Sequence, residues 1–266
     1  MKLVRLAPLI VLCLAFTVSA QLQPQHSVTG RAEIKKNAAE QLAYARQLIN
    51  AIPATADQHR RMEPAWNAVT ALRLIPARWP NEKAIVTESL LLQEYVLLNE
   101  NFLTVALAAL HDAEKSAAGT DAMARVYSEE GFVYRRLHQY EEAAAAFDRA
   151  ARHAAFHTLA IPKLVGTLSE YADVESRLGR HQQAAAHLRA AAEIPSLPPF
   201  NRVGLMLRSF EQNDQLSDKT EARKDLAKID DLLMEAKRTL TSSPSEIAMV
   251  NEYEKEVKRH HARLGV

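Results

Sequence analysis

The chain has 266 residues, of which 48% are hydrophobic, 24% are charged and only 6% are aromatic, and it contains 7 glycines. This is a globular composition that favours helix, because abundant Ala, Leu, Glu, Gln and Arg lose little rotamer freedom there. The formal net charge is +1, with basic and acidic residues interleaved, so we expect no nucleic-acid partner and no anionic membrane partner.

The first 20 residues have the features of an export signal. Lys2 and Arg5 give a basic start, and the apolar run from Leu6 to Phe16 is too short to span a bilayer as a helix. Val18-Ser19-Ala20 places small residues at the positions that a signal peptidase recognises, so we expect cleavage after Ala20. The mature chain would be exported, periplasmic or secreted, without stable membrane insertion; an uncleaved anchor helix is the alternative.

The single cysteine, Cys13, lies inside this signal. The mature chain would therefore have no disulfide, no thiol nucleophile and no cysteine ligand for a metal. Removal of the signal also leaves 31 basic residues against 32 acidic ones.

Residues 21–30 are polar and unpatterned, and we expect a flexible segment. Apolar residues then recur at intervals of three and four along residues 31–215, which is typical of amphipathic helices, and no strand is expected. The expected helices are one ending at Pro53, one around Trp66–Ile75 ending at Pro76, one capped by Asn81, and then Phe102–Ala113, Asp121–Leu137, Glu141–Ala155, Ile161–Leu178, Gln182–Ala192 and a short Asn201–Phe210.

Three of these segments share a spacing of small and large residues. Each has an alanine, a large apolar residue four positions later and an alanine three positions after that. A small residue lets two helices approach, and a bulky one fills the groove beside it. The three sets are Ala106, Leu110 and Ala113; Ala143, Phe147 and Ala150; and Ala184, Leu188 and Ala191.

The middle segment also has Gly131 twelve residues before Ala143, with Tyr127 and Tyr134 around it. On these positions, residues 124–155 resemble a tetratricopeptide repeat. Residues 165–196 resemble it less closely, and residues 87–118 are a divergent unit with Glu94 where the small residue belongs. The intervals of 37 and 41 residues between the aligned alanines exceed the roughly 34 of a standard repeat. A helical bundle without repeats is the alternative.

The resemblance implies an all-α solenoid of antiparallel helical hairpins, whose first helices line a concave face that receives a protein or a peptide. An arginine pair beside an aromatic ring is suited to an acidic or C-terminal peptide. The alternative is that both arginines are simply solvated and that Phe132 packs on the neighbouring hairpin. By the same resemblance, the exposed residues of this face are Arg125, Ser128, Phe132, Arg135, Ser169, Asp173 and Ser176.

No sequence pattern indicates catalysis, a metal or a cofactor. His153 and His157 stand four apart, but no acidic residue lies between them as a metalloprotease requires, so we interpret them as surface residues near a helix end. There is no glycine-rich phosphate loop after a strand and no Gly-x-Ser-x-Gly elbow. We therefore expect a non-enzymatic protein; a helical hydrolase with an unrecognised site is the less favoured alternative.

Residues 216–266 are expected to form a hairpin that caps the solenoid. Its first helix runs from about Ser217 to Leu240, and its second begins at Ser243-Pro244, which suits a helix start. A terminal repeat needs a polar outer face, which favours a cap. Self-association through residues 218–262, giving a homo-oligomeric assembly module of the cell envelope, is the alternative function.

Overall fold

A computed structural model describes residues 33–54, 57–239 and 243–265 of the chain; the expected signal and flexible segment, 1–30, lie outside them. Within these residues the structure is all-α and has no strand, which confirms the predicted fold class. The helices are α1 Ala38–Asn50, α2 Gln58–Arg78, α3 Lys83–Asn99, α4 Leu103–Ala117, α5 Ala122–Arg136, α6 Tyr140–Arg152, α7 Ile161–Arg177, α8 His181–Ala192, α9 Pro199–Gln215, α10 Lys219–Thr239 and α11 Pro244–Leu264, with a short 3-10 turn at Phe156–Thr158.

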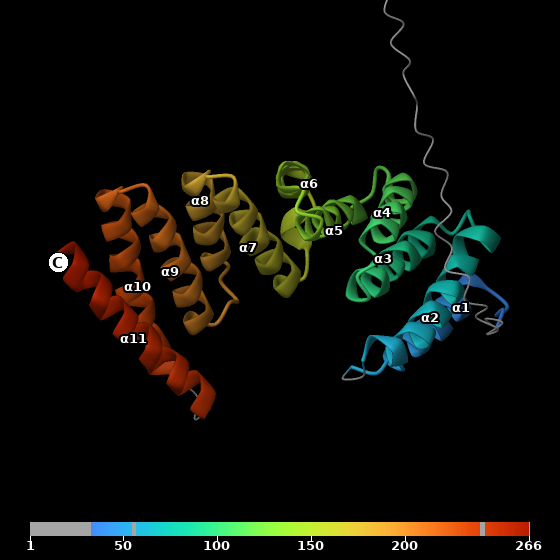
Figure 1. The fold of residues 1–266 in the computed structure, drawn as a ribbon, viewed down its shortest axis with the longest axis horizontal. Helices are drawn as coiled ribbons and strands as arrows, with labels where there is room; N and C mark the ends of the chain where they lie inside the picture. Colours follow the sequence, from blue (N-terminus) through green and yellow to red (C-terminus); the bar gives the residue numbers. More distant parts are fainter. Residues whose placement is uncertain (1–32, 55–56, 240–242, 266) are drawn as a thin grey trace, which may run out of the picture.

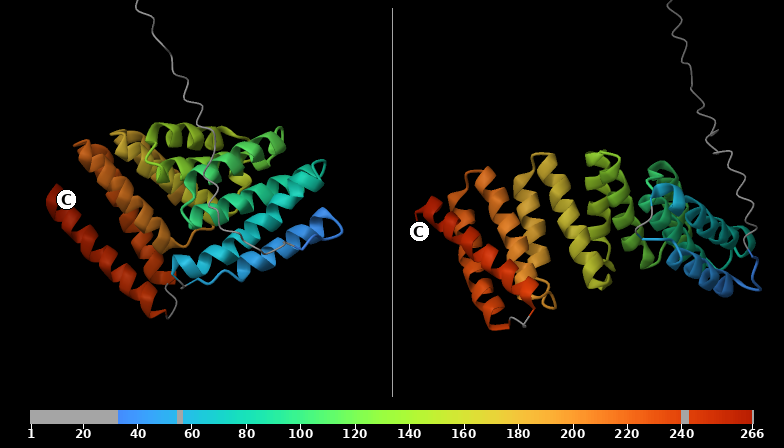
Figure 2. Two further views of the ribbon diagram at one scale, coloured as in Figure 1. Left: turned by 45° about the vertical axis from the view of Figure 1, so that its right-hand side comes forward. Right: turned by 60° about the horizontal axis from the view of Figure 1, so that its bottom comes forward.

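The helices pair as consecutive hairpins, and each hairpin packs on the next one along the chain. The pairs are α1 with α2, α3 with α4, α5 with α6, α7 with α8, and α9 with α10; α11 then packs on α10 and α9. Figure 1 shows the result as an arch, with α3 and α5 on its inner side and α4 and α6 on its outer side. Figure 2 shows the same order of hairpins from two further directions.

The turns inside four of the hairpins are equivalent. Each contains one residue with positive φ, at Asn101, His138, Gly179 and Ser217. Each is closed by a hydrogen bond of 2.8–3.1 Å from a backbone N–H to the carbonyl five residues earlier, as in a Schellman helix end. These turns are 37, 41 and 38 residues apart, so α9 and α10 form a further repeat of the same kind. The expected boundary at residue 216 falls inside this hairpin.

Gly131 and Phe147 show why the small–large spacing matters. Phe147 is completely buried, and a Cβ atom added at Gly131 would overlap its ring. Glycine is therefore required for α5 and α6 to approach with a phenylalanine between them. In the preceding hairpin the equivalent positions hold Glu94 and Leu110, so a residue larger than glycine on the first helix faces a residue smaller than phenylalanine on the second.

Several helix ends differ from the sequence prediction. Helix α2 continues through Pro76 to Arg78, because the chain still closes a helical hydrogen bond from Trp79 N–H to the Ile75 carbonyl at 2.9 Å. Helix α3 begins after Glu82, and Asn81 does not cap it. Helix α9 is longer than the expected Asn201–Phe210 segment, since Pro199 at its first position is compatible with a helix start.

Helix α11 covers the end of the stack with a polar outer surface. Only Val250 and Val257 are fully buried. Its other sides carry mostly exposed polar and charged residues, namely Asn251, Glu252, Lys255, Lys258, Arg259 and Arg263. Two exposed apolar residues, Ile247 and Met249, lie near its first turns. This distribution is that of a terminal helix facing water.

Candidate partner-binding surface

The first helices of successive hairpins are joined by ion pairs. Glu88 of α3 accepts from Arg125 of α5 at 2.9 Å, and Glu129 of α5 pairs with Lys163 of α7 at 2.7 Å. Arg125 also lies 3.9 Å from Glu129, so these four charges form one continuous row across three hairpins.

A second row continues towards the C-terminal end. Arg135 of α5 pairs with Glu170 of α7 at 2.6 Å, and Asp173 of α7 accepts from Arg208 of α9 at 2.5 Å. We call these two rows together the ion-pair ladder. Each exposed pair is worth only about 0–1 kcal/mol, so the ladder fixes the register of the hairpins more than it stabilises them.

The structure places the predicted arginines in this ladder. Arg125 and Arg135 have side chains that are 37% and 30% exposed, and each already holds a carboxylate of a neighbouring hairpin. They are therefore neither free nor simply solvated. A partner's carboxylate would have to compete with Glu88 or Glu170 for them. Asp173 is half-exposed and is held in the same way by Arg208.

Phe132 is only partly exposed and packs between hairpins. Its ring meets Phe147 edge-on at 5.5 Å, and the Lys163 ammonium lies 4.5 Å from its centroid. Ser128 is completely buried and donates a hydrogen bond to the Ala124 carbonyl at 2.9 Å. The prediction that Ser128 is exposed is wrong, because this side of α5 faces the interior of the stack.

The two predicted serines of α7 lie near polar groups of α9. Ser169 is partly exposed, and its backbone carbonyl accepts a long hydrogen bond of 3.4 Å from Arg208. Ser176 borders a cavity of about 450 Å³ whose other walls include Asp214, His260 and Arg263. The predicted residues thus do not converge on one point but follow the first helices of two hairpins.

Two buried carboxyl groups were not singled out as site residues by the sequence. Glu94 is only 2% exposed, and its Oε1 has no hydrogen-bond partner among the described residues. Burial raises its pKa to about 9, with a further contribution from the Glu129 carboxylate against the opposing effects of Lys163 and Arg125. Glu94 is therefore protonated at neutral pH.

Glu130 is buried as well but has a cationic partner. Arg149 of α6 donates to its carboxylate at 2.6 Å, and the same guanidinium lies 4.2 Å from the Tyr127 ring centroid. Burial raises the pKa of Glu130, and Arg149 opposes this shift. The ion pair of Glu130 and Arg149 therefore links α5 to α6.

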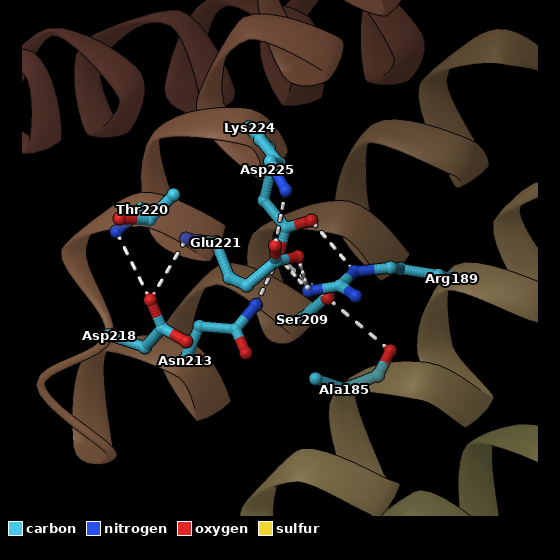
Figure 3. Close-up of polar contacts among 9 residues, drawn as sticks. All are labelled: Ala185, Arg189, Ser209, Asn213, Asp218, Thr220, Glu221, Lys224 and Asp225. Carbon is cyan, nitrogen blue, oxygen red and sulfur yellow. Dashed lines mark hydrogen bonds and ion pairs between the residues drawn. The ribbon is translucent and has the colours of Figure 1, made fainter.

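Asp225 of α10 is the centre of a buried polar network, shown in Figure 3. Its carboxylate accepts hydrogen bonds from Arg189 Nε at 2.9 Å, Ser209 Oγ at 2.8 Å and Asn213 Nδ2 at 2.7 Å. These donors come from α8 and α9, so one carboxylate connects three helices (Figure 3). Because its carboxylate oxygens accept these hydrogen bonds, Asp225 has a structural role and holds α8, α9 and α10 together.

The histidines of the third and fourth hairpins make contacts within the chain. Among the described residues no group of three or more possible ligands converges. His153 accepts a hydrogen bond from the Ala155 backbone N–H at 3.2 Å. His181 is bonded to Gln212 at 2.9 Å, and His187 stacks on Tyr171 with ring centroids 3.9 Å apart.

A further cavity of about 410 Å³ lies between α9 and α11 and extends to Val165 of α7. Its polar residues are Asn201, Arg208 and Glu211 from α9 and Tyr253 and Glu256 from α11. The sequence did not indicate this cavity, because α11 was expected to pair with α10 alone. No helix of the described ranges is long and apolar enough to cross a bilayer.

Comparison with known proteins identifies the fold. A MamA protein matches over 77% of this chain and 100% of its own, with 17% identity and a TM-score of 0.54. A putative kinesin light chain of Podosopora anserina with nearly identical TPR-like repeats matches over 78% and 100%, with 16% identity and a TM-score of 0.54. The chain has a tetratricopeptide-like fold. This TPR-like architecture confirms the predicted helical-repeat resemblance.

A MamA RS-1 double mutant is a further TPR-like match, at 13% identity, a TM-score of 0.55 and coverage of 79% of this chain and 100% of that one. No family model matches the sequence, and no curated protein does. At these identities the likeness establishes the TPR-like fold alone.

Proposed function

We propose that this chain is a non-catalytic TPR-like scaffold that holds a protein or a peptide along the inner face formed by α3, α5, α7 and α9. The observation that carries the proposal is the repeat fold itself, which stacks the first helices of successive hairpins into one extended surface. An extended concave surface suits a long, unfolded or helical segment better than it suits a compact substrate.

The ion-pair ladder supports this proposal. It keeps the spacing of the first helices constant, so the surface is pre-organised and loses little conformational freedom when a partner is bound. Its charges are also partly exposed, so they remain available for electrostatic steering. An acidic segment would interact with Arg125 and Arg135 in competition with Glu88 and Glu170.

Parallel affinity captures from an envelope extract of the source cells test the proposal. The baits are the unchanged protein, an inner-face variant with Arg125→Gln and Arg135→Gln, and an outer control with Arg152→Gln on α6, whose side chain is 80% exposed. We expect the inner-face variant to lose proteins that both other baits retain. Identical sets from all three baits would refute the assignment of this face.

Export remains part of the proposal. It is supported by the basic start, the short apolar run and the small residues before Gln21, and by the confinement of the only cysteine to this segment. The protein recovered from its source should begin at Gln21 by mass spectrometry. A mass that includes residues 1–20 would contradict cleavage.

Self-association through the C-terminal helices is less well supported. The outer side of α11 is mainly charged, and its exposed apolar residues are limited to the first turns. A surface of this kind is more stable in contact with water than buried against a second copy of the chain. We therefore propose that the chain acts as a single copy.

A further inference from the structure

The ion-pair ladder is interrupted at its C-terminal end. The equivalent turns place Asp173 of α7 and Glu211 of α9 at the same position of consecutive hairpins, 38 residues apart. Asp173 is paired with Arg208 on the following first helix. For Glu211 the following helix is α11, which presents Tyr253 and Glu256 at the shared cavity instead of a cation.

Two carboxylates therefore face one cavity without a full complement of cations. The Glu211 side chain has no ion pair and no hydrogen bond within the described ranges of the chain. Glu256 has only the His260 imidazole, 3.7 Å away. The nearby arginines are already engaged, Arg208 with Asp173 and Arg263 with Asp214 at 3.0 Å.

The electrostatics of Glu211 reflect this imbalance. Glu211 is an exposed residue, but desolvation of its carboxyl group at the cavity raises its pKa, the Glu256 carboxylate raises it further, and Arg208 and Arg263 oppose the shift. Burial and Glu256 also raise the pKa of Tyr253, so its hydroxyl stays protonated. The repulsion between two carboxylates at one site decreases when a cation lies between them.

The cavity has the size and walls of a side-chain pocket. Its volume of about 410 Å³ lies within the usual range of roughly 300–1,000 Å³ for ligand sites. Val165 and Leu197 form an apolar wall. Gly204 leaves room for the Tyr253 hydroxyl, which lies 2.7 Å from where a Cβ atom would stand.

We propose that this cavity receives a lysine or arginine side chain from the bound segment of a partner protein. Its cation would lie between Glu211 and Glu256 as the missing member of the ladder, with its aliphatic stem against Val165 and Leu197 and its charge near the Tyr253 ring. This inference rests on the proposed function and gives its partner a chemical property, a basic residue that reaches the C-terminal end of the inner face.

The test uses three short probes that differ only in their two charged residues: acetyl-Ala-Lys-Ala-Lys-Ala-amide, its arginine counterpart and its glutamate counterpart. Each is titrated into isotope-labelled protein, and backbone amide shifts are followed by NMR. We expect both basic probes to shift the amides of Gly204, Tyr253 and Glu256 in a saturable way. The acidic probe should leave these amides unchanged.

Two variants separate binding from folding. Glu211→Gln with Glu256→Gln keeps the shape of both side chains but removes their charge, and we expect at least about tenfold weaker binding of the basic probes. The same variant should melt at a higher temperature without probe, because the like charges are gone. Glu252→Gln is the matched control, since Glu252 lies on α11 away from the cavity and pairs with Lys255 at 2.7 Å. It should leave the affinity unchanged.

Equal binding of acidic and basic probes would overturn the inference, and so would an unchanged affinity of the double variant. Failure here is distinguishable from failure of the proposed function. If the cavity ignores basic probes while the Arg125→Gln, Arg135→Gln bait still loses its partners, the inner face remains the binding surface and only the basic pocket is refuted.

Discussion

Replacing Glu94 with glutamine should stabilise the protein in a manner that depends on pH. The pKa of Glu94 is raised from 4.5 to about 9 by burial and by Glu129. The folded state therefore binds the proton more tightly than the unfolded state. Stability from this proton is fully present below pH 4.5 and is lost as pH rises towards 9.

The magnitude follows from the free energy of one pKa unit, about 1.36 kcal/mol. Between about pH 4.5 and about pH 7.5 the loss for the unchanged protein reaches at most about 4 kcal/mol, and the pKa on which this rests already includes the opposing effects of Lys163 and Arg125. Glu94→Gln has the shape of the protonated carboxyl group but does not titrate. Its advantage should therefore be small near pH 5 and grow steadily up to about pH 8.

Urea unfolding followed by far-UV circular dichroism at several pH values measures this difference. Glu142→Gln is the matched control, because Glu142 is exposed on α6, and it should leave the pH dependence as it is. A stability difference between Glu94→Gln and the unchanged protein that is constant over this pH range would refute the reasoning. A variant less stable than the unchanged protein near pH 8 would refute it as well.

Two further predictions concern the packing of the helices, and a third concerns the oligomeric state. Asp225→Ala should cost about 3–5 kcal/mol of unfolding free energy, because it leaves the buried Ser209 and Asn213 without their acceptor and removes a carboxylate partner of Arg189. A loss below about 1 kcal/mol in urea titration would contradict the structural role of the network. Gly131→Ala should destabilise by about 1–3 kcal/mol through overlap with Phe147, and Phe147→Leu in the same chain should recover part of this loss. Light scattering on the eluting protein should give the mass of one chain at high concentration, and a dimer would revive the self-association alternative.

Much of the fold was predictable because the repeats show as a regular spacing of small and large residues in the sequence. Ala143, Phe147 and Ala150 must alternate as they do for α5 and α6 to pack, so the hairpin is readable from the sequence. The hairpin of α9 and α10 was missed because two of its equivalent positions differ. Phe210 stands where Gly131 does, and Ile229 replaces the second alanine.

The inner surface was predictable only in part. The periodicity placed Arg125 and Arg135 on the correct helix, but their partners Glu88 and Glu170 are 37 and 35 residues away. Such pairs arise from the rotation between hairpins, which a single sequence does not specify. For the same reason the sequence could not show that Ser128 faces inward.

The sequence also contains an indication that Glu94 is buried, but this indication has two possible interpretations. The sequence shows a carboxylate at the position of a small residue, and this reads as divergence from the repeat. Whether the side chain leaves the groove or stays in it depends on the size of its neighbours in three dimensions. Leu110 opposite, smaller than Phe147, is compatible with the second outcome.

The central claim is that a partner lies along the inner face, and site-specific photo-crosslinking in the source cells tests it most directly. A benzophenone amino acid replaces Tyr95, which is 54% exposed on α3 and equivalent by spacing to Phe132, or Gln183, which is exposed on α8. We predict a discrete crosslinked partner from position 95 and none from position 183. Crosslinks of equal yield and identity from both positions, or from position 183 alone, would contradict the account.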